Sequence, residues 1–401
     1  MISLSEAQSQ LNALHPLPPR VFSLDRALGL VCSEDVYACI NCPTVDSSLK
    51  DGLAVRSPDV MDASFDNPCA LTVKGSLSAG DTVNIGSLMP GEAVRIMTGS
   101  QIPPGATAVL ASEFVNNNEG RIFAVADAEP GRNILRQGSD IQLGQNVLSR
   151  GVELRPTHLG LLAAAGVHEV SCYPRAQVAV AATGSELVLP GEPVCRGKVA
   201  ASNMVTIAAE LRARGISATT VLLRDDLEKL QEHFHTLVNQ VDVLITCGGV
   251  LDGDKDLTLQ AMRAIGMEVL FHRVRIGPGK GVCMGRVGRT LIFNLPGGPP
   301  SNHVAFLLLA LPGIRRLMGF TKFLPRKLPV VSEEDFHGQK DWTQLMYCRL
   351  KYEKDSLYAV VLKNSGRLYA MAEADALLEI PEGCSRVGND RKAYAWAFRD
   401  V

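Results

Sequence analysis

The most constraining feature of the sequence is an alternation of apolar strand candidates and amphipathic helix candidates between residues 174 and 320. The strands are expected at 177–182, 216–223, 241–247, 270–276 and 290–294, and the helices at 203–214, 226–239, 256–265 and 301–318. Strands that are apolar along their whole length have to be buried on both faces. The alternation therefore predicts a doubly wound, mainly parallel sheet that is covered by helices.

The regions on either side of this segment have other patterns. Residues 1–45 are predicted to be helical, with a cap at Ser3 and a second helix over 23–29. Residues 46–143 hold short apolar runs between Gly, Pro, Asp and Asn clusters, which predicts a β-rich subdomain, and 156–165 are predicted to form a helix. The C-terminal fifth of the chain predicts a small β-barrel or sandwich.

Composition narrows the class of protein. The 40 basic and 42 acidic residues nearly balance, which argues against a general nucleic-acid binder. No apolar run reaches the length of a membrane span, and the N-terminus lacks the pattern of a secretory signal, so we expect a cytoplasmic protein. The ten cysteines include one CxxC, Cys39 and Cys42, but no second pair that would complete a zinc site. We therefore expect reduced thiols.

Polar and glycine-rich loops follow three of the predicted strands, at the sheet edge where doubly wound folds bind ligands. The first is the Glu186 loop (residues 182–186), whose carboxylate could contact a metal or hydroxyl, or could stand in solvent. The second is the Gly248 loop (residues 247–256), where Gly248 and Gly249 allow backbone N–H groups to approach an anion at a helix N-terminus. Its carboxylates suit Mg²⁺, although Asp256 could equally cap the helix.

The third is the Pro296 loop (residues 294–302), in which three prolines predict a fixed shape and Ser301 is expected to cap the next helix. Between the second and third loops lies the Lys280 loop (residues 276–281), where a lysine among glycines could bind phosphate or could be a solvated turn residue. The spacing is not that of a Walker A motif. From the residues alone, these loops indicate an anion site with Mg²⁺.

At these loops the chain resembles the molybdopterin molybdenumtransferase family, which includes the bacterial MoeA proteins and the E domain of gephyrin. The resemblance extends over the whole chain, in segments that follow the family's order. These segments are 43–52, 95–99 with 103–109, 133–141, 183–187, 248–256, 278–280 and 295–299.

The resemblance implies a multidomain α/β protein with a MogA-like α/β domain. It implies a helical linker domain at 1–45 and 144–173, an inserted β-rich subdomain at 46–143, the α/β domain at 174–322 and a C-terminal β-barrel at 323–401. It also implies a homodimer whose active site lies between the α/β domain of one subunit and the β-rich subdomain of the other. Transient contacts with the molybdopterin adenylyltransferase and with apo-molybdoenzymes are expected, and no contact with nucleic acid or membrane.

The implied reaction converts molybdate and adenylylated molybdopterin into molybdenum cofactor and AMP, with Mg²⁺ required. Residue by residue, the expected catalytic positions are Asp51, Thr98, Glu186, Asp256 and Lys280, with Glu186 and Asp256 as the metal ligands. The expected binding positions are Gly248, Gly249, Asp225, Asp226, Pro296, Gly297, Pro299, Ser301, Arg349 and Ser365.

Three departures from the family pattern bear on activity. Lys50 and Leu53 flank Asp51–Gly52 where the family often has Met and Tyr, and Ser185 stands where it often has Asp. Gly277 stands where a lysine usually precedes the proline, which removes a cation from the expected anion site.

Two other functions stay open. The sister adenylyltransferase carries Gly-Gly-Thr-Gly at the second loop, whereas this chain has Val250 after its two glycines. A non-catalytic cofactor-binding or scaffold paralogue is the other alternative, which Gly277 favours. The sequence does not distinguish molybdate from tungstate.

Overall fold

The computed structural model describes residues 1–249, 257–332, 334–353, 355–364, 366–388 and 392–398. The chain divides into two compact units. The first unit comprises 1–20, 29–33 and 172–401, and the second comprises 21–28 and 34–171. Each unit has hydrophobic clusters of its own.

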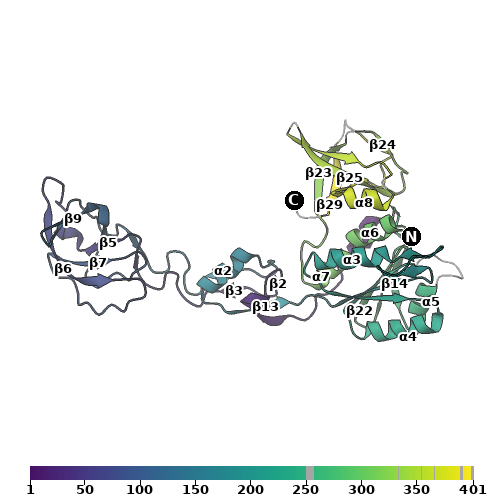
Figure 1. The fold of residues 1–401 in the computed structure, drawn as a ribbon, viewed down its shortest axis with the longest axis horizontal. Coiled ribbons are helices and arrows are strands. Elements are labelled where there is room, and N and C mark those ends of the chain that lie inside the picture. Colours follow the sequence, from purple (N-terminus) through teal and green to yellow (C-terminus); the bar gives the residue numbers. More distant parts are fainter. Residues whose placement is uncertain (250–256, 333, 354, 365, 389–391, 399–401) are drawn as a thin grey trace. The chain divides into compact units, whose positions relative to one another are not determined.

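A six-stranded sheet forms the centre of the first unit (Figure 1). Its order is β17 (Ala218–Leu223), β14 (Val178–Thr183), β18 (Val243–Cys247), β22 (Thr290–Leu295), β21 (Cys283–Val287) and β19 (Glu268–His272). The first four strands are parallel, and β21 is antiparallel to both of its neighbours, β22 and β19, so that β19 runs in the direction of the first four strands. The predicted mainly parallel sheet is thus confirmed, and β21 is a strand that the sequence patterns did not indicate.

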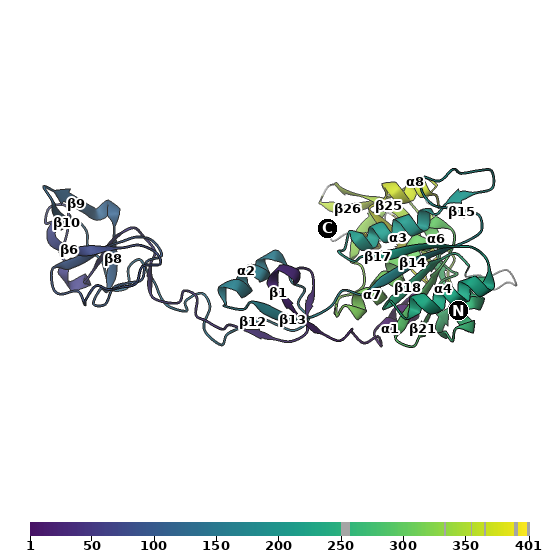
Figure 2. The same cartoon turned by 60° about the horizontal axis from the view of Figure 1, so that its bottom comes forward.

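Helices cover both faces of this sheet, as Figure 2 shows. Alternate residues of β14 enter two different clusters: Val178 and Val180 pack with α3 (Ser202–Arg212), and Ala179 and Ala181 pack with α4 (Leu227–Val238) and α5 (Leu257–Ala264). The first face also holds α6 (Pro299–Ala305) and α7 (Leu311–Leu317), which a buried π-helical segment at Phe306–Ala310 joins. Burial on both faces explains why these strands are apolar throughout.

The predicted N-terminal helix is confirmed as α1 (Leu4–Leu11), which Ser3 caps together with Glu6. The predicted helix over 23–29 is wrong, since only a 3₁₀ turn at Leu24–Arg26 forms there. The flanking strands β1 (Arg20–Ser23) and β2 (Val31–Cys32) pair on either side of β13 (Glu169–Tyr173). Strand pairing therefore overrides the local helix signals.

The second unit is β-rich, as predicted. Its main sheet has the order β8 (Ala108–Ala111), β5 (Gly52–Val55), β7 (Glu92–Ile96), β6 (Cys69–Leu77), β10 (Arg121–Ala124) and β9 (Val115–Asn118). Two short pairs join β3 (Val36–Tyr37) to β12 (Asn146–Leu148) and β4 (Ser47–Ser48) to β11 (Ile134–Leu135). Its one described α-helix, α2 (Pro156–Ala164), begins at a proline as expected, and 3₁₀ turns lie at Ser57–Asp59 and Ser112–Phe114.

The C-terminal region is a closed five-stranded barrel. Of the two predicted forms, barrel and sandwich, the barrel is therefore the one that occurs. Its strands are β25 (Thr343–Glu353), β26 (Ser356–Val361), β23 (Lys327–Ser332), β29 (Lys392–Ala397) and β27 (Ala376–Ile380), and β27 pairs back with β25. The remaining elements are β15 (Leu187–Val188), β16 (Val199–Ala200), β20 (Ile276–Gly277), β24 (Phe336–His337), β28 (Arg386–Val387) and α8 (Leu368–Glu373). No helix within the described residues is long and apolar enough to cross a membrane.

Two helical glycines predict opposite effects of the same substitution. A Cβ at Gly313 in α7 would lie 2.6 Å from Cζ of the fully buried Phe293, whereas a Cβ at Gly160 in α2 would meet nothing within 4 Å. Gly313→Ala should lower the free energy of unfolding by about 1–3 kcal/mol through overpacking. Gly160→Ala should raise it by about 0.5–1 kcal/mol through helix propensity. Thermal and urea denaturation measure both changes in the free energy of unfolding. If the two substitutions change it in the same direction, the predicted clash at Gly313 is contradicted.

Candidate functional site

The three predicted loops of the α/β sheet meet at one sheet edge. The Glu186 loop and the Gly248 loop follow neighbouring parallel strands, and the Pro296 loop follows the next strand along the sheet. The backbone N–H of Gly184 donates to the Leu223 carbonyl at 3.1 Å, and that of Gly248 donates to the Leu295 carbonyl at 2.9 Å. These bonds continue the sheet beyond the last strand residues, so the loops begin side by side.

Glycine is required where two of these loops touch. Gly248 has φ +112°, and a Cβ there would lie 2.9 Å from the Thr183 carbonyl oxygen. A Cβ at Gly297 would lie 3.8 Å from the Cα of Gly248, so the second and third loops also approach closely. Close approach of two backbones at glycines is a feature that anion-binding loops share.

The Glu186 loop is held by a reciprocal pair of hydrogen bonds. The Ser185 N–H donates to Oδ2 of Asp225 at 2.7 Å, and the Asp225 N–H donates to Oγ of Ser185 at 3.2 Å. Arg224 and Lys198 both donate to the Ser185 carbonyl, at 3.0 and 2.7 Å. Asp225, predicted as a binding residue, therefore supports the loop. Ser185, noted as a departure from the family, is the residue that Asp225 holds.

Asp226, the second of the two neighbouring aspartates expected to bind ligand, caps α4. Its carboxylate accepts from the Lys229 N–H at 3.2 Å and forms an ion pair with the Lys229 ammonium at 3.1 Å. These contacts, the backbone bond first, hold the pKa of Asp226 below its usual value. A capping role accounts for this carboxylate.

Glu186 is exposed, and its carboxylate lies over Gly184, because a Cβ at Gly184 would lie 2.7 Å from each carboxylate oxygen. Asp256, the second predicted metal ligand, lies outside the described residues. Within the described ranges, no group of three or more His, Cys, Asp or Glu side chains could hold a metal ion. The buried thiol of Cys247 at the adjacent strand end has its pKa raised to about 12 by burial, so it stays protonated at neutral pH.

The Pro296 loop is fixed by two asparagines that the sequence reasoning did not assign. Nδ2 of Asn302 donates to the Pro296 carbonyl at 2.9 Å, and Nδ2 of Asn203 donates to the Gly297 carbonyl at 2.8 Å. The prediction that Ser301 caps the helix is wrong. The N-cap is Gly298, and prolines occupy the first helical turn ahead of Ser301. The sequence signal that could have found them is an asparagine near the start of each of the two helices α3 and α6.

The Lys280 loop lies beside the Pro296 loop. A Cβ at Gly279 would lie 3.5 Å from the Ser301 carbonyl oxygen. Strand β20 pairs in parallel with the start of β25 in the barrel, which brings Trp342 close to the loop. The Lys280 ammonium lies over the Trp342 ring, 5.3 Å from its centroid, so the exposed lysine has a defined position.

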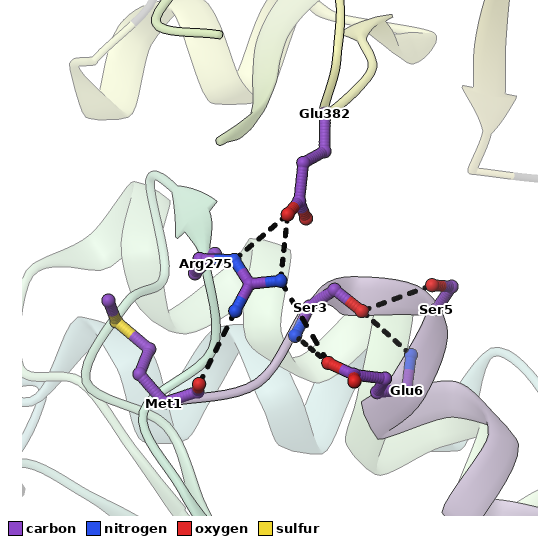
Figure 3. Close-up of polar contacts among 6 residues, drawn as sticks. All are labelled: Met1, Ser3, Ser5, Glu6, Arg275 and Glu382. Atoms are coloured by element: carbon purple, nitrogen blue, oxygen red, sulfur yellow. Dashed lines mark hydrogen bonds and ion pairs between the residues drawn. The ribbon is translucent and has the colours of Figure 1, made fainter. Parts of the chain in front are cut away.

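Arg275 anchors the base of this loop (Figure 3). Its Nε and Nη2 donate to Oε1 of Glu382 in the barrel at 3.0 and 2.7 Å, and its Nη1 donates to the Met1 carbonyl at 3.4 Å. Glu6 of α1 lies 3.9 Å from the same guanidinium. One arginine thus links the chain's N-terminal segment, the Lys280 loop and the barrel (Figure 3).

The remaining predicted residues lie elsewhere in the fold. In the second unit, the Thr98 N–H and hydroxyl both donate to Oδ1 of Asp51, at 2.7 and 2.8 Å. These two bonds lower the pKa of Asp51. In the barrel, Arg349 forms an ion pair with Glu373, and Ser365 lies outside the described residues. All ten cysteines are described, and no disulfide joins any of them.

The contact between Lys280 and Trp342 generates a prediction that needs no substrate. A cation–π contact at an exposed site contributes about 0.5–1 kcal/mol, less than the about 1.5–3 kcal/mol of a hydrogen bond to a charged group. Pyrophosphate should therefore draw the ammonium away from the ring and change the fluorescence of Trp342. The chain has two tryptophans, so Trp342→Phe should abolish the response and Trp396→Phe should preserve it. A response that survives Trp342→Phe would disprove the contact's role.

Comparison with family models accounts for most of the chain. The MoeA N-terminal region (domain I and II) matches residues 2–166, the probable molybdopterin binding domain matches 179–316, and the MoeA C-terminal region (domain IV) matches 329–390. The α/β sheet and the loops at its edge lie in the second of these matches.

Similar proteins and structures agree with these matches. Molybdopterin molybdenumtransferase 2 of Mycobacterium tuberculosis is 32% identical, over 94% of this chain and 95% of the relative. The molybdopterin molybdenumtransferase of Haemophilus influenzae is 35% identical, over 80% and 78%. Two structures of the MoeA protein from Pyrococcus horikoshii cover 100% and 99% of this chain and all of their own chains, with TM-scores of 0.84 and 0.80 at 29% and 26% identity. The chain therefore belongs to the MoeA family of molybdopterin molybdenumtransferases.

Proposed function

We propose that this protein inserts molybdenum from molybdate into adenylylated molybdopterin and releases AMP, the last step of molybdenum cofactor biosynthesis. The observation that carries this proposal is the meeting of three glycine-containing loops at the ends of neighbouring parallel strands. That arrangement fits a phosphorylated ligand. Relatives that match over more than nine-tenths of the chain carry the name of this activity, which supports the same conclusion.

The chain's own residues would act mainly through charge. Cleavage of a phosphoanhydride requires the negative charge on the departing phosphate to be stabilised. The N–H groups of Gly249 and Gly297 and the ammonium of Lys280 are suited to that task, whereas the Gly248 N–H already donates to the Leu295 carbonyl. Pro296, Pro299 and the asparagine-held carbonyls keep the third loop in one shape, so the N–H groups require little rearrangement when the ligand binds.

We propose that Mg²⁺ is the metal cofactor. The exposed carboxylate of Glu186 fits it, because Mg²⁺ takes one or two protein carboxylates and keeps water or phosphate oxygens as its other ligands. Asp256 would be the second carboxylate. When bound, Mg²⁺ would supply positive charge to the phosphates of the substrate.

The quaternary organisation belongs to the same proposal. We infer a cytoplasmic homodimer in which Asp51 and Thr98 serve the active site of the other subunit, and transient contacts with the adenylyltransferase and with apo-molybdoenzymes. Sedimentation velocity tests the dimer. Mixing Asp51→Asn protein with Glu186→Gln protein tests whether each active site uses residues of both subunits. If it does, a mixed dimer contains one site with both wild-type residues and regains activity.

The main test of the proposed reaction is AMP release. Purified protein with adenylylated molybdopterin, Mg²⁺ and molybdate should release AMP, and omission of molybdate or addition of EDTA should suppress the release. Glu186→Gln and Asp256→Ala should each slow it by at least about tenfold through loss of a metal ligand. Glu192→Gln, a change to a carboxylate six positions further along the chain that accepts from the Leu189 N–H at 2.8 Å, is the matched control.

Other outcomes identify the alternatives. Release of AMP that does not depend on molybdate, or no release at all, rejects insertion. Pyrophosphate formed from ATP and molybdopterin would indicate the adenylyltransferase. Tight binding without turnover would indicate a non-catalytic paralogue.

Substitution of Gly277 by a lysine is expected to strengthen anion binding, whereas the substitutions above are expected to slow the reaction. A Cβ there would meet only Cγ of Gln344 at 4.0 Å, and the backbone does not have positive φ, so a side chain fits. Gly277→Lys restores the cation that relatives usually carry and should tighten pyrophosphate binding about tenfold at low salt. Gly277→Gln controls for side-chain size. Equal affinity in both variants would show that the added charge does not reach the anion.

A further inference from the structure

A buried polar chain connects the helix face of the α/β domain to the barrel behind the Pro296 loop. Nε2 of His303 lies 3.4 Å from Oε1 of Glu210, and Nδ1 of His303 lies 3.0 Å from the hydroxyl of Tyr347. That hydroxyl lies 3.3 Å from the carbonyl oxygen of Pro300, within the Pro296 loop. Three elements separated in sequence, α3, α6 and β25, therefore share one hydrogen-bonded path, and Pro300 lies where the Pro296 loop enters α6.

The path is closed to solvent at its centre. The His303 side chain is 5% exposed and Tyr347 is 0% exposed. The two rings stack with an interplanar angle of 7°, and Phe398 packs edge-on against both. At the outer end, Arg214 forms an ion pair with Glu210 and donates to the Phe398 carbonyl at 2.8 Å. The charged and titratable groups that face His303 are thus Glu210 and Arg214 from α3 and Tyr347 from β25.

Two of these groups keep one charge state near neutral pH. Burial opposes ionisation of Glu210, but the hydrogen bond from His303 and the Arg214 guanidinium outweigh it and lower the pKa of Glu210. Burial and the Glu210 charge raise the pKa of Tyr347 far above its usual value. A carboxylate therefore stands at one side of the imidazole and an intact hydroxyl at the other.

Two arrangements of protons satisfy the hydrogen bonds between Glu210, His303 and Tyr347. In both, the Nε2–H of His303 donates to Glu210, because a lone pair facing the carboxylate would be repelled. When Nδ1 is unprotonated, it accepts the Tyr347 O–H. When Nδ1 takes up a proton, it donates to the Tyr347 oxygen, and the O–H turns to the Pro300 carbonyl. One proton is gained at Nδ1 and one hydroxyl rotates.

We propose that Glu210, His303 and Tyr347 are positioning residues for the Pro296 loop, and that proton uptake by His303 attaches the Tyr347 hydroxyl to the Pro300 carbonyl. The loop is tied to the barrel in the protonated state and released from that tie in the neutral state. Its consequence for substrate binding rests on the function proposed above. The tie itself is a property of the fold and is measurable without substrate.

The direct test is a pH titration of the full chain by NMR with ¹⁵N-labelled histidine and glycine. The signals of the His303 ring nitrogens should change with pH as Nδ1 takes up a proton, and the amide signals of Gly297 and Gly298 should shift with the same midpoint. Tyr347→Phe should uncouple the glycine signals from His303. Tyr394→Phe, the same change at an exposed barrel tyrosine, should leave the coupling intact.

Several results would overturn the proposal. The tie is refuted by glycine signals that do not change together with those of the His303 ring, or by glycine signals that still follow the ring in Tyr347→Phe. It is also refuted by a ring that takes up no proton while the protein stays folded. His303→Gln provides a second variant if Tyr347→Phe fails to fold, and its loop signals should be independent of pH.

The kinetic counterpart separates this inference from the proposed reaction. Tyr347→Phe should raise the KM for adenylylated molybdopterin about two- to tenfold, the range expected for one hydrogen bond, with kcat nearly unchanged. It should also flatten the pH dependence of kcat/KM, which a purely structural role would not do. Absence of AMP release from the wild-type protein rejects the reaction and leaves the NMR result standing. If Tyr347→Phe flattens the pH dependence of kcat/KM but leaves the NMR coupling between His303 and the glycines intact, the tie is rejected.

Discussion

Burial of four parallel strands on both faces is the constraint on which the rest of the first unit depends. Because helices cover each face, polar loops have room only at the strand ends. The bonds from Gly184 to Leu223 and from Gly248 to Leu295 then bring neighbouring loops into register. The anion-binding character of the site follows from this packing together with glycines at the points of closest approach.

The barrel and the N-terminal segment brace this edge. Strand β20 pairs with β25, Arg275 binds Glu382, and Tyr347 reaches the Pro296 loop, so three separate contacts join the barrel to loops of the sheet. All three act on segments that flank the predicted anion site. We infer that the barrel's main contribution to activity is to fix loop geometry.

The sequence predicted the sheet well because burial on both faces leaves a strong mark in apolar periodicity. The resemblance named Asp51 and Thr98 as individual site residues, and the structure joins them by hydrogen bonds although 47 positions separate them. The predictions that depended on local capping signals fared worse. Ser23 and Ser301 both resemble helix caps, but strand pairing at β1 and the prolines ahead of Ser301 determine the actual starts. Local signals cannot report what a distant segment will pair with.

Supporting residues were harder to predict than site residues. Asn203, Asn302 and Trp342 acquire their roles only when helix starts and a barrel strand come together, and the position of the two asparagines near helix starts is a weak signal for those roles. Asp225 is a residue expected to bind ligand that the structure shows holding a loop, and its binding role stays a prediction. The four-domain boundaries and the roles of Asp256 and Ser365 remain predictions.

The position of α1 has a consequence for synthesis on the ribosome. Leu4, Ala7 and Leu11 pack into the same cluster as Leu317, yet the second unit lies between them in the chain. The second unit can fold once residue 171 has emerged, whereas the apolar face of α1 waits until α7 is made. Leu11 and Leu317 are 306 positions apart, so at about 5–20 residues per second that wait lasts roughly fifteen to sixty seconds. For that time, a nascent chain of this protein leaves the apolar side chains of its first segment without the partners that bury them in the folded unit.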